Sequence, residues 1–245
     1  MEIIKENISK QTGRRCPVLK NEIQGMEIIV CTLPAGEKET VEPETDTAVA
    51  FIFTRGQGTC SQGEASFPVS ETALFAPEHT IQAEITASSS TPLVFLELRI
   101  AVSEKDCSVF TESSAKYPFL KSWSTCETYK EKIKSEKTVN RMLLPEFTFP
   151  RLCIGAVQTT GPDTVGRHDH PMLEQLFFGL QDNRCRVLAD DASAEFLEND
   201  LLHIPLGSSH GVEVDPGFEL NYIWIDLFRD HSGMEYIASE HVRDN

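Results

Sequence analysis

Short apolar or alternating runs recur along most of the chain, and clusters of Gly, Pro and Ser separate them. This spacing is typical of strands in an all-β sandwich or barrel. A first series of predicted strands covers residues 26–33, 47–55, 71–77, 80–87 and 92–100. A second series covers residues 147–160, 173–181, 185–190, 200–205, 210–215 and 219–228.

The two series resemble each other. The run "ETALFAPEHTIQAEI" (71–85) parallels "NDLLHIPLGSSHGVEV" (199–214), and "AVAFIFTRGQGTC" (48–60) parallels "LEQLFFGLQDNRC" (173–185). Such a repeat predicts an internal duplication that gives two small β-barrels in tandem. The three glycines of residues 55–63 predict a hairpin loop between two short strands.

A polar stretch separates the two series. Residues 122–142 are rich in Lys and Glu, lack Gly and Pro, and have few apolar positions. This composition favours a helical or irregular connector. We therefore expect an N-terminal barrel over 1–110, a partly helical connector over 111–146 and a C-terminal barrel over 147–245.

Charge and composition exclude several classes of function. The formal charge of the 245 residues is −16, and Lys and Arg are scattered, which argues against nucleic acid and against anionic membrane surfaces. No run approaches the length of a membrane span, and the charged N-terminus does not resemble a secretory signal. Seven cysteines without a CxxC pair predict free thiols, so a cytoplasmic location is expected.

The stretch "GRHDHPMLEQLFFG" (166–179) concentrates groups that can bind a metal. His168 and His170 would share one face of a strand, and Glu174 would share it too if Pro171 and Met172 do not break the register. On this segment alone a charged surface strand explains the pattern as well as a metal site does.

A fourth residue favours the metal. His210 ends the run "NDLLHIPLGSSH", where a strand and a Pro-x-Gly turn would return it across the barrel. Three neutral imidazoles and a carboxylate suit a divalent transition ion such as Mn, Fe, Co, Ni or Zn. The ligands predicted are therefore His168, His170, Glu174 and His210.

These two stretches resemble the two short motifs of the cupin superfamily. The first motif has the form G-x5-H-x-H-x3,4-E-x6-G and the second G-x5-P-x-G-x2-H-x3-N. Pro205 and Gly207 match the second motif, whereas Asn199 replaces its first Gly and tolerates a left-handed turn. The resemblance implies a bicupin: two double-stranded β-helix (jelly-roll) barrels, the second carrying the metal. It also implies a homodimer.

The N-terminal repeat lacks the ligands. The positions equivalent to the first motif fall within residues 40–49, which contain no His. His79 lies near the place of the fourth ligand, but one imidazole cannot hold an ion. We expect the first barrel to be free of metal and to support the second.

Other residues are weaker candidates. His203 is expected to be a satisfied core or rim histidine. Arg151 and Arg167 could neutralise an anionic substrate, although surface salt bridges are favoured for both. Tyr222, Trp224 and Asp226 share one face of the last strand, and the pattern does not show which face is inward.

Two functions remain open, beside a purely structural role without a bound ion. The first is a metal-dependent enzyme that acts on a small polar metabolite, within the dioxygenase, isomerase, decarboxylase or lyase, and amidohydrolase classes that the resemblance implies. The second is a non-catalytic small-molecule-binding or sensor bicupin. Fold does not imply function, so the sequence does not choose among these reactions.

Overall fold

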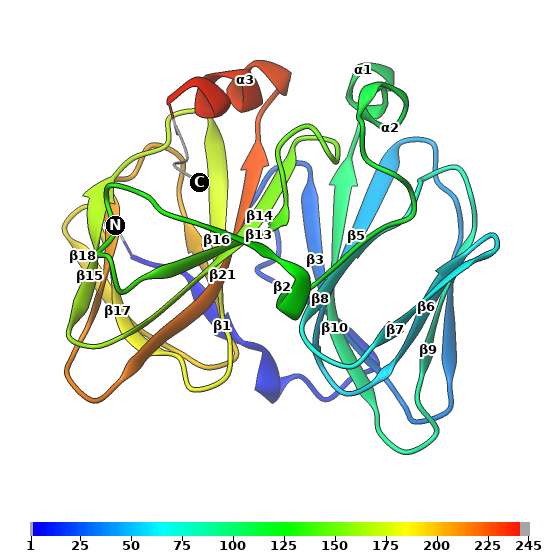
Figure 1. The fold of residues 1–245 in the computed structure, drawn as a ribbon, viewed down its shortest axis with the longest axis horizontal. Helices are drawn as coiled ribbons and strands as arrows, with labels where there is room; N and C mark the ends of the chain where they lie inside the picture. The colour runs from blue at the N-terminus through cyan, green and yellow to red at the C-terminus, as the bar shows by residue number, and fades with distance from the viewer. Residues whose placement is uncertain (1, 241–245) are drawn as a thin grey trace. The chain divides into compact units, whose positions relative to one another are not determined.

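The computed structural model describes residues 2–240, with side chains described as far as residue 235. The chain forms two compact units. One comprises residues up to Ser9, Glu127–Phe147 and the chain from Arg151 onward, and the other comprises Lys10–Cys126 and Thr148–Pro150. Each is an antiparallel β-sandwich (Figure 1).

The C-terminal unit has a seven-stranded and a four-stranded sheet. The order of the larger is β1 (Lys5–Asn7), β19 (Asp200–Ile204), β16 (Leu173–Gly179), β21 (Glu219–Phe228), β14 (Leu152–Thr160), β13 (Val139–Leu144) and β12 (Glu127–Tyr129). The order of the smaller is β15 (Asp163–His168), β20 (His210–Val214), β17 (Arg184–Ala189) and β18 (Ala192–Leu197).

The N-terminal unit has a six-stranded and a four-stranded sheet. The order of the larger is β11 (Phe119–Ser122), β8 (Ala73–Ala76), β5 (Thr47–Arg55), β10 (Leu93–Ala101), β3 (Met26–Leu33) and β2 (Arg15–Val18). The order of the smaller is β4 (Lys38–Val41), β9 (Ala83–Ala87), β6 (Gly58–Gln62) and β7 (Ala65–Val69).

Helices are few in the described chain. The α-helices are α1 (Glu104–Cys107), α2 (Val109–Glu112) and α3 (His231–Glu240), and the 3-10 turns are η1 (Ile8–Lys10) and η2 (Trp123–Thr125). None of the helices in residues 2–240 is long and apolar enough to cross a membrane.

The strand orders confirm the duplication. The order β15-β20-β17-β18 in one unit corresponds to β4-β9-β6-β7 in the other, and β19-β16-β21-β14 corresponds to β8-β5-β10-β3. Apolar side chains of facing sheets form a separate core in each unit. The prediction of two all-β barrels is therefore confirmed.

Several segments differ from the sequence-based expectation. Residues 122–142 hold one 3-10 turn, the strand β12 and the start of β13, because pairing with β14 overrides a weak helical propensity. The expected hairpin loop at 55–63 contains β6, which pairs with β7 and β9. The segment 147–151 is a turn before β14, with Phe147 and Arg151 at positive φ.

The units also divide the chain differently from the expected boundaries at 110 and 147. β1 pairs with β19, so the first strand belongs to the C-terminal barrel. The connector is shared between the barrels: its first part, with β11, belongs to the N-terminal unit, and β12 and β13 extend the large sheet of the C-terminal unit.

Candidate metal centre

Three of the four predicted ligands meet inside the C-terminal barrel. His168 ends β15, His170 lies just before the turn at Pro171 and Met172, and His210 begins β20. The pairing of β15 with β20 places His168 opposite His210. A register irregularity between Val165 and His168 re-aims the end of the strand, as β-bulges beside functional sites often do.

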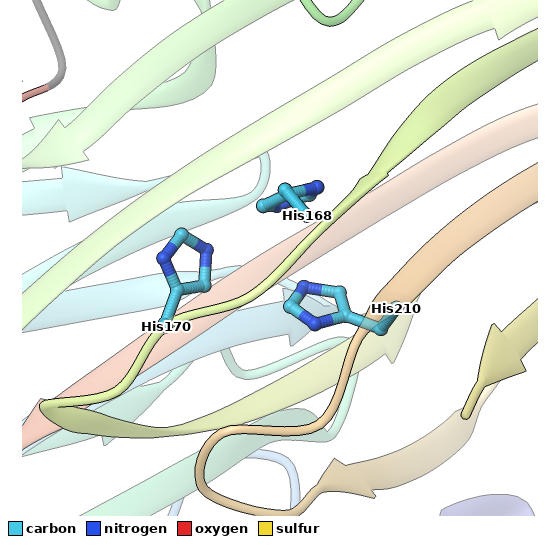
Figure 2. Close-up of side chains that lie close together, drawn as sticks. All are labelled: His168, His170 and His210. Carbon is cyan, nitrogen blue, oxygen red and sulfur yellow. The ribbon is translucent and has the colours of Figure 1, made fainter.

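The three imidazole rings surround a common space (Figure 2). Ring centroids lie 4.4 Å apart for His168 and His210, 4.8 Å for His168 and His170, and 5.4 Å for His170 and His210. One nitrogen from each ring lies within 4.8 Å of the others. Since nitrogens bound to one ion at about 2.1 Å lie roughly 3–3.5 Å apart, a side-chain movement of about an ångström brings them to one ion.

Hydrogen bonds fix the tautomers of two of the rings. Nδ1 of His168 lies 2.8 Å from the carbonyl oxygen of Gly166, and Nδ1 of His210 lies 3.0 Å from that of Ser208. A carbonyl oxygen only accepts, so each Nδ1 carries the proton and each Nε2 presents its lone pair. Metal-binding histidines are oriented by this kind of bond.

The chemistry of the triad fits a transition ion. Burial, and then the neighbouring His168, lower the pKa of His210 to about 4, so the ring is neutral near pH 7. Its Nε2 is buried and has no hydrogen-bond partner among the described residues. A buried lone pair without a donor carries a desolvation cost, which a metal ion would remove. The adjoining cavity of about 50 Å³ exceeds the roughly 10–15 Å³ that one water needs.

Glu174 is not brought to this cluster. Its Oε2 lies 3.1 Å from Nε2 of His203 and accepts the backbone N–H of Leu206 at 3.1 Å. The cause is the turn at Pro171 and Met172, which ends β15 before β16 begins at Leu173. The alternation of inward and outward side chains therefore restarts at Leu173. Of the four expected ligands, the structure brings together His168, His170 and His210.

The next residue, Gln175, occupies the inward face instead. It lines the cavity together with His168, His170 and His210. In the form of the cupin motif with four residues before the glutamate, position 175 is the one that matches. Sequence reasoning missed Gln175 because it used the shorter spacer.

The large sheet supplies the wall that faces the histidines. Tyr222, Trp224 and Asp226 of β21 all line the cavity, which identifies the inward face that the sequence left open. Asp226 lies opposite Gln175 in the register and accepts its Nε2–H at 2.7 Å on Oδ1. Burial raises the pKa of Asp226 to about 8, although the bond from Gln175 acts against the shift.

The later part of the expected connector also lines the cavity. Glu131, Ile133 and Lys134 line it, and the backbone N–H of Gly166 donates to the carbonyl of Ile133 at 2.9 Å. The Lys134 ammonium lies 2.7 Å from Glu131 and donates to Asn140 at 2.8 Å. No sequence signal pointed to this segment as part of the site.

The other candidates lie elsewhere. His203 is buried and bonded to Glu174, as expected of a satisfied core histidine. Arg151 donates to the backbone carbonyls of Phe228 and Arg229, and Arg167 donates to those of Asp190 and Ser209. In the N-terminal unit His79 stacks on Phe110, with ring centroids 4.6 Å apart.

Known proteins resemble this chain in structure rather than in sequence. No family model and no curated relative matches the sequence. Among solved structures, a variant of oxalate decarboxylase from Bacillus subtilis superimposes with a TM-score of 0.69 at 15% identity, over 94% of this chain and 78% of that one. A cupin 2 conserved barrel domain protein from Leptotrichia buccalis gives 0.64 at 15% identity, over 92% and 96%.

A third structure widens the chemistry of the neighbours. Salicylate 1,2-dioxygenase from Pseudaminobacter salicylatoxidans superimposes with a TM-score of 0.64 at 7% identity, over 94% of this chain and 80% of that one. These identities establish shared architecture, and fold alone does not transfer an activity. With its duplicated eight-strand order and its structural neighbours, the chain has the fold of the cupin superfamily, in the two-barrel form of the bicupins.

Proposed function

We propose that the C-terminal barrel binds one divalent transition-metal ion through His168, His170 and His210, and that the protein is a metal-dependent enzyme acting on a small polar metabolite. The convergence of three imidazoles at the ends of β15 and β20 carries this proposal. Two of them are held with Nε2 presented to the same space. Such a set suits Mn, Fe, Co, Ni or Zn.

The residues around the triad suit chemistry on a small molecule. When bound, an ion of this kind polarises a carbonyl or carboxylate oxygen or lowers the pKa of bound water. Val165, Phe177, Val212 and Trp224 line the cavity and limit the entry of bulk water. Gln175 and Asp226 add a hydrogen-bonded amide and carboxyl to the cavity wall.

The reaction class is proposed as a set. Neighbours named as an oxalate decarboxylase and a salicylate 1,2-dioxygenase support decarboxylase and dioxygenase types. The isomerase, lyase and amidohydrolase types are proposed from the resemblance of the sequence motifs alone. The test is a metabolite screen of protein loaded separately with each metal, with and without oxygen. Turnover that needs both Fe(II) and oxygen would support the dioxygenase and reject the isomerase and hydrolase types.

A non-catalytic small-molecule-binding or sensor bicupin is the second candidate. The connector segment that carries Lys134 lines the cavity, and the Lys134 side chain is only 6% exposed. A small cavity lined by this segment also suits retention of a ligand. Tight binding of a metabolite without turnover would favour this function, and turnover of any metabolite in the screen would reject it.

Location and assembly complete the proposal. We expect a cytoplasmic protein without nucleic-acid or membrane partners, given the charge of −16 and the seven free cysteines. The edge strands that cupin barrels commonly pair make a homodimer the expected assembly. Light scattering coupled to size-exclusion chromatography tests this expectation, and a mass of 27.4 kDa would reject it.

A further inference from the structure

The buried pair Gln175 and Asp226 points to a fourth protein ligand. Gln175 is 6% exposed, and its Nε2 donates to Asp226 at 2.7 Å. Its Oε1 is buried and has no hydrogen-bond partner among the described residues. A buried amide oxygen without a hydrogen-bond donor loses its bonds to water and gains none in return, so its presence in a folded protein needs a structural explanation.

The location of this oxygen supplies that explanation. Gln175 shares the cavity with the three histidines, and a second unsatisfied buried atom there is Nε2 of His210. Both atoms present lone pairs and neither has a donor. Two orphaned lone pairs in one cavity are satisfied together by a cation.

We propose that the amide oxygen of Gln175 completes the metal site, and that Asp226 orients the amide by accepting its N–H. The inference rests on the proposed function, since it concerns the same ion. An amide donates and accepts at once, so Gln175 can bond to Asp226 through nitrogen and face the ion through oxygen. A carboxylate at position 175 would lie against the Asp226 carboxyl, and two such groups must share a proton.

The arrangement separates two neighbours on one strand. Gln175 faces the cavity, whereas Glu174 bonds to His203 and Leu206. The family's glutamate position thus holds an amide in this chain, and the adjacent glutamate serves as a structural contact. Asp226 is a positioning residue, because it acts on the ion through Gln175.

The test is Co²⁺ titration of the full chain, followed by visible absorption and by competition with a chelator. Gln175→Met removes the amide oxygen and keeps the volume. Asp226→Leu removes the acceptor, and Asp226→Asn restores one. Glu174→Gln is the matched control on the neighbouring position. Near-ultraviolet circular dichroism checks that each variant is folded.

The expected result is a weakening of Co²⁺ affinity of roughly 10- to 100-fold for Asp226→Leu, as for other residues that orient ligands, and at least as much for Gln175→Met. Glu174→Gln and Asp226→Asn stay close to wild type. In a Gln175→Met background, Asp226→Leu adds no further loss, because its effect passes through Gln175. Gln175→Met alone leaves the buried Asp226 carboxyl without its donor. If that variant fails to fold, the double variant, which has no carboxyl at position 226, still tests the loss of the amide oxygen.

Contrary outcomes are distinct. Wild-type affinity and an unchanged Co²⁺ spectrum in Gln175→Met would overturn the inference while leaving the metal site intact. A loss confined to Glu174→Gln would restore the ligand set expected from the sequence and also overturn it. Failure of the wild-type chain itself to bind Co²⁺ would instead reject the proposed function.

Discussion

Replacing Asp226 by Asn should stabilise the metal-free protein increasingly as pH rises. Asp226 is 7% exposed, and it faces Gln175 with Glu131, Glu146 and Lys134 as its charged neighbours. Burial, the dominant cause, raises its pKa to about 8 in the folded state, against about 3.9 in an unfolded chain. The folded state therefore holds the proton over a range in which the unfolded state releases it.

The sign and magnitude follow from proton linkage. A raised folded-state pKa favours folding below pH 4, and this contribution is lost as pH rises toward 8. Between pH 5 and pH 8 the wild type loses about 3–4 kcal/mol at 1.36 kcal/mol per pH unit. Asn carries no proton to lose. The stability difference between variant and wild type should thus grow by about this amount, on the order of 10 °C in melting temperature.

The assay is calorimetry of the metal-free protein, in the presence of a chelator, at several pH values. The unfolding transition to follow is the one whose midpoint Co²⁺ shifts in protein without chelator. Asp163→Asn is the control. Burial of Asp163 is outweighed by hydrogen bonds from Thr159 and Ser135, and its pKa is lowered. Its effect should be nearly constant above pH 5. A stability difference for Asp226→Asn that does not change between pH 5 and pH 8 would refute a protonated Asp226 in the metal-free site.

Three further predictions test the metal site and the packing of the barrel around it. His210→Ala or His170→Ala should lose most of the metal on desalting, because two imidazoles hold a labile ion far more weakly than three. Elemental analysis measures the metal content, with His203→Gln as the control, and full retention of the metal would contradict the prediction. Gly155→Ala should cost about 1–3 kcal/mol in urea unfolding, because its Cβ would lie 2.2 Å from Cζ2 of Trp224; an unchanged unfolding midpoint would show that the indole moves freely. Burial raises the pKa of Cys185 to about 12, so this thiol should react with a disulfide reagent only after unfolding. Mass spectrometry checks this after a short treatment of the native protein, and a modified Cys185 would contradict the prediction.

The strand pattern was largely predictable, and its exceptions have physical causes. The bounds of β3, β5 and β21 match the apolar runs, because these central strands are buried on both faces. β1 and β12 escaped prediction because they are three-residue edge strands with polar sequences. β1 is also defined by a distant partner, β19, whereas β12 pairs with the next strand, β13.

The candidate site was predictable as far as the histidines. The spacing of His168, His170 and His210 reflects a turn and a strand pairing that recur in the fold, and Asn199 adopts the expected left-handed conformation at φ 63°. Whether Glu174 or Gln175 faces inward depends on where β16 begins after Pro171. Counting the alternation of side chains through a turn does not show this. Asp226 and the connector wall are brought to the site by contacts between segments distant in sequence.

The most direct test of the account is the metal content of the purified protein. The chain should be expressed and purified without chelators, then analysed for Mn, Fe, Co, Ni and Zn, both as isolated and after reconstitution. The account predicts close to one equivalent of a single divalent transition ion per chain, lost in a variant with His168, His170 and His210 all replaced by Ala. Less than about a tenth of an equivalent of any of these metals after reconstitution, or equal binding by the triple variant, would contradict it.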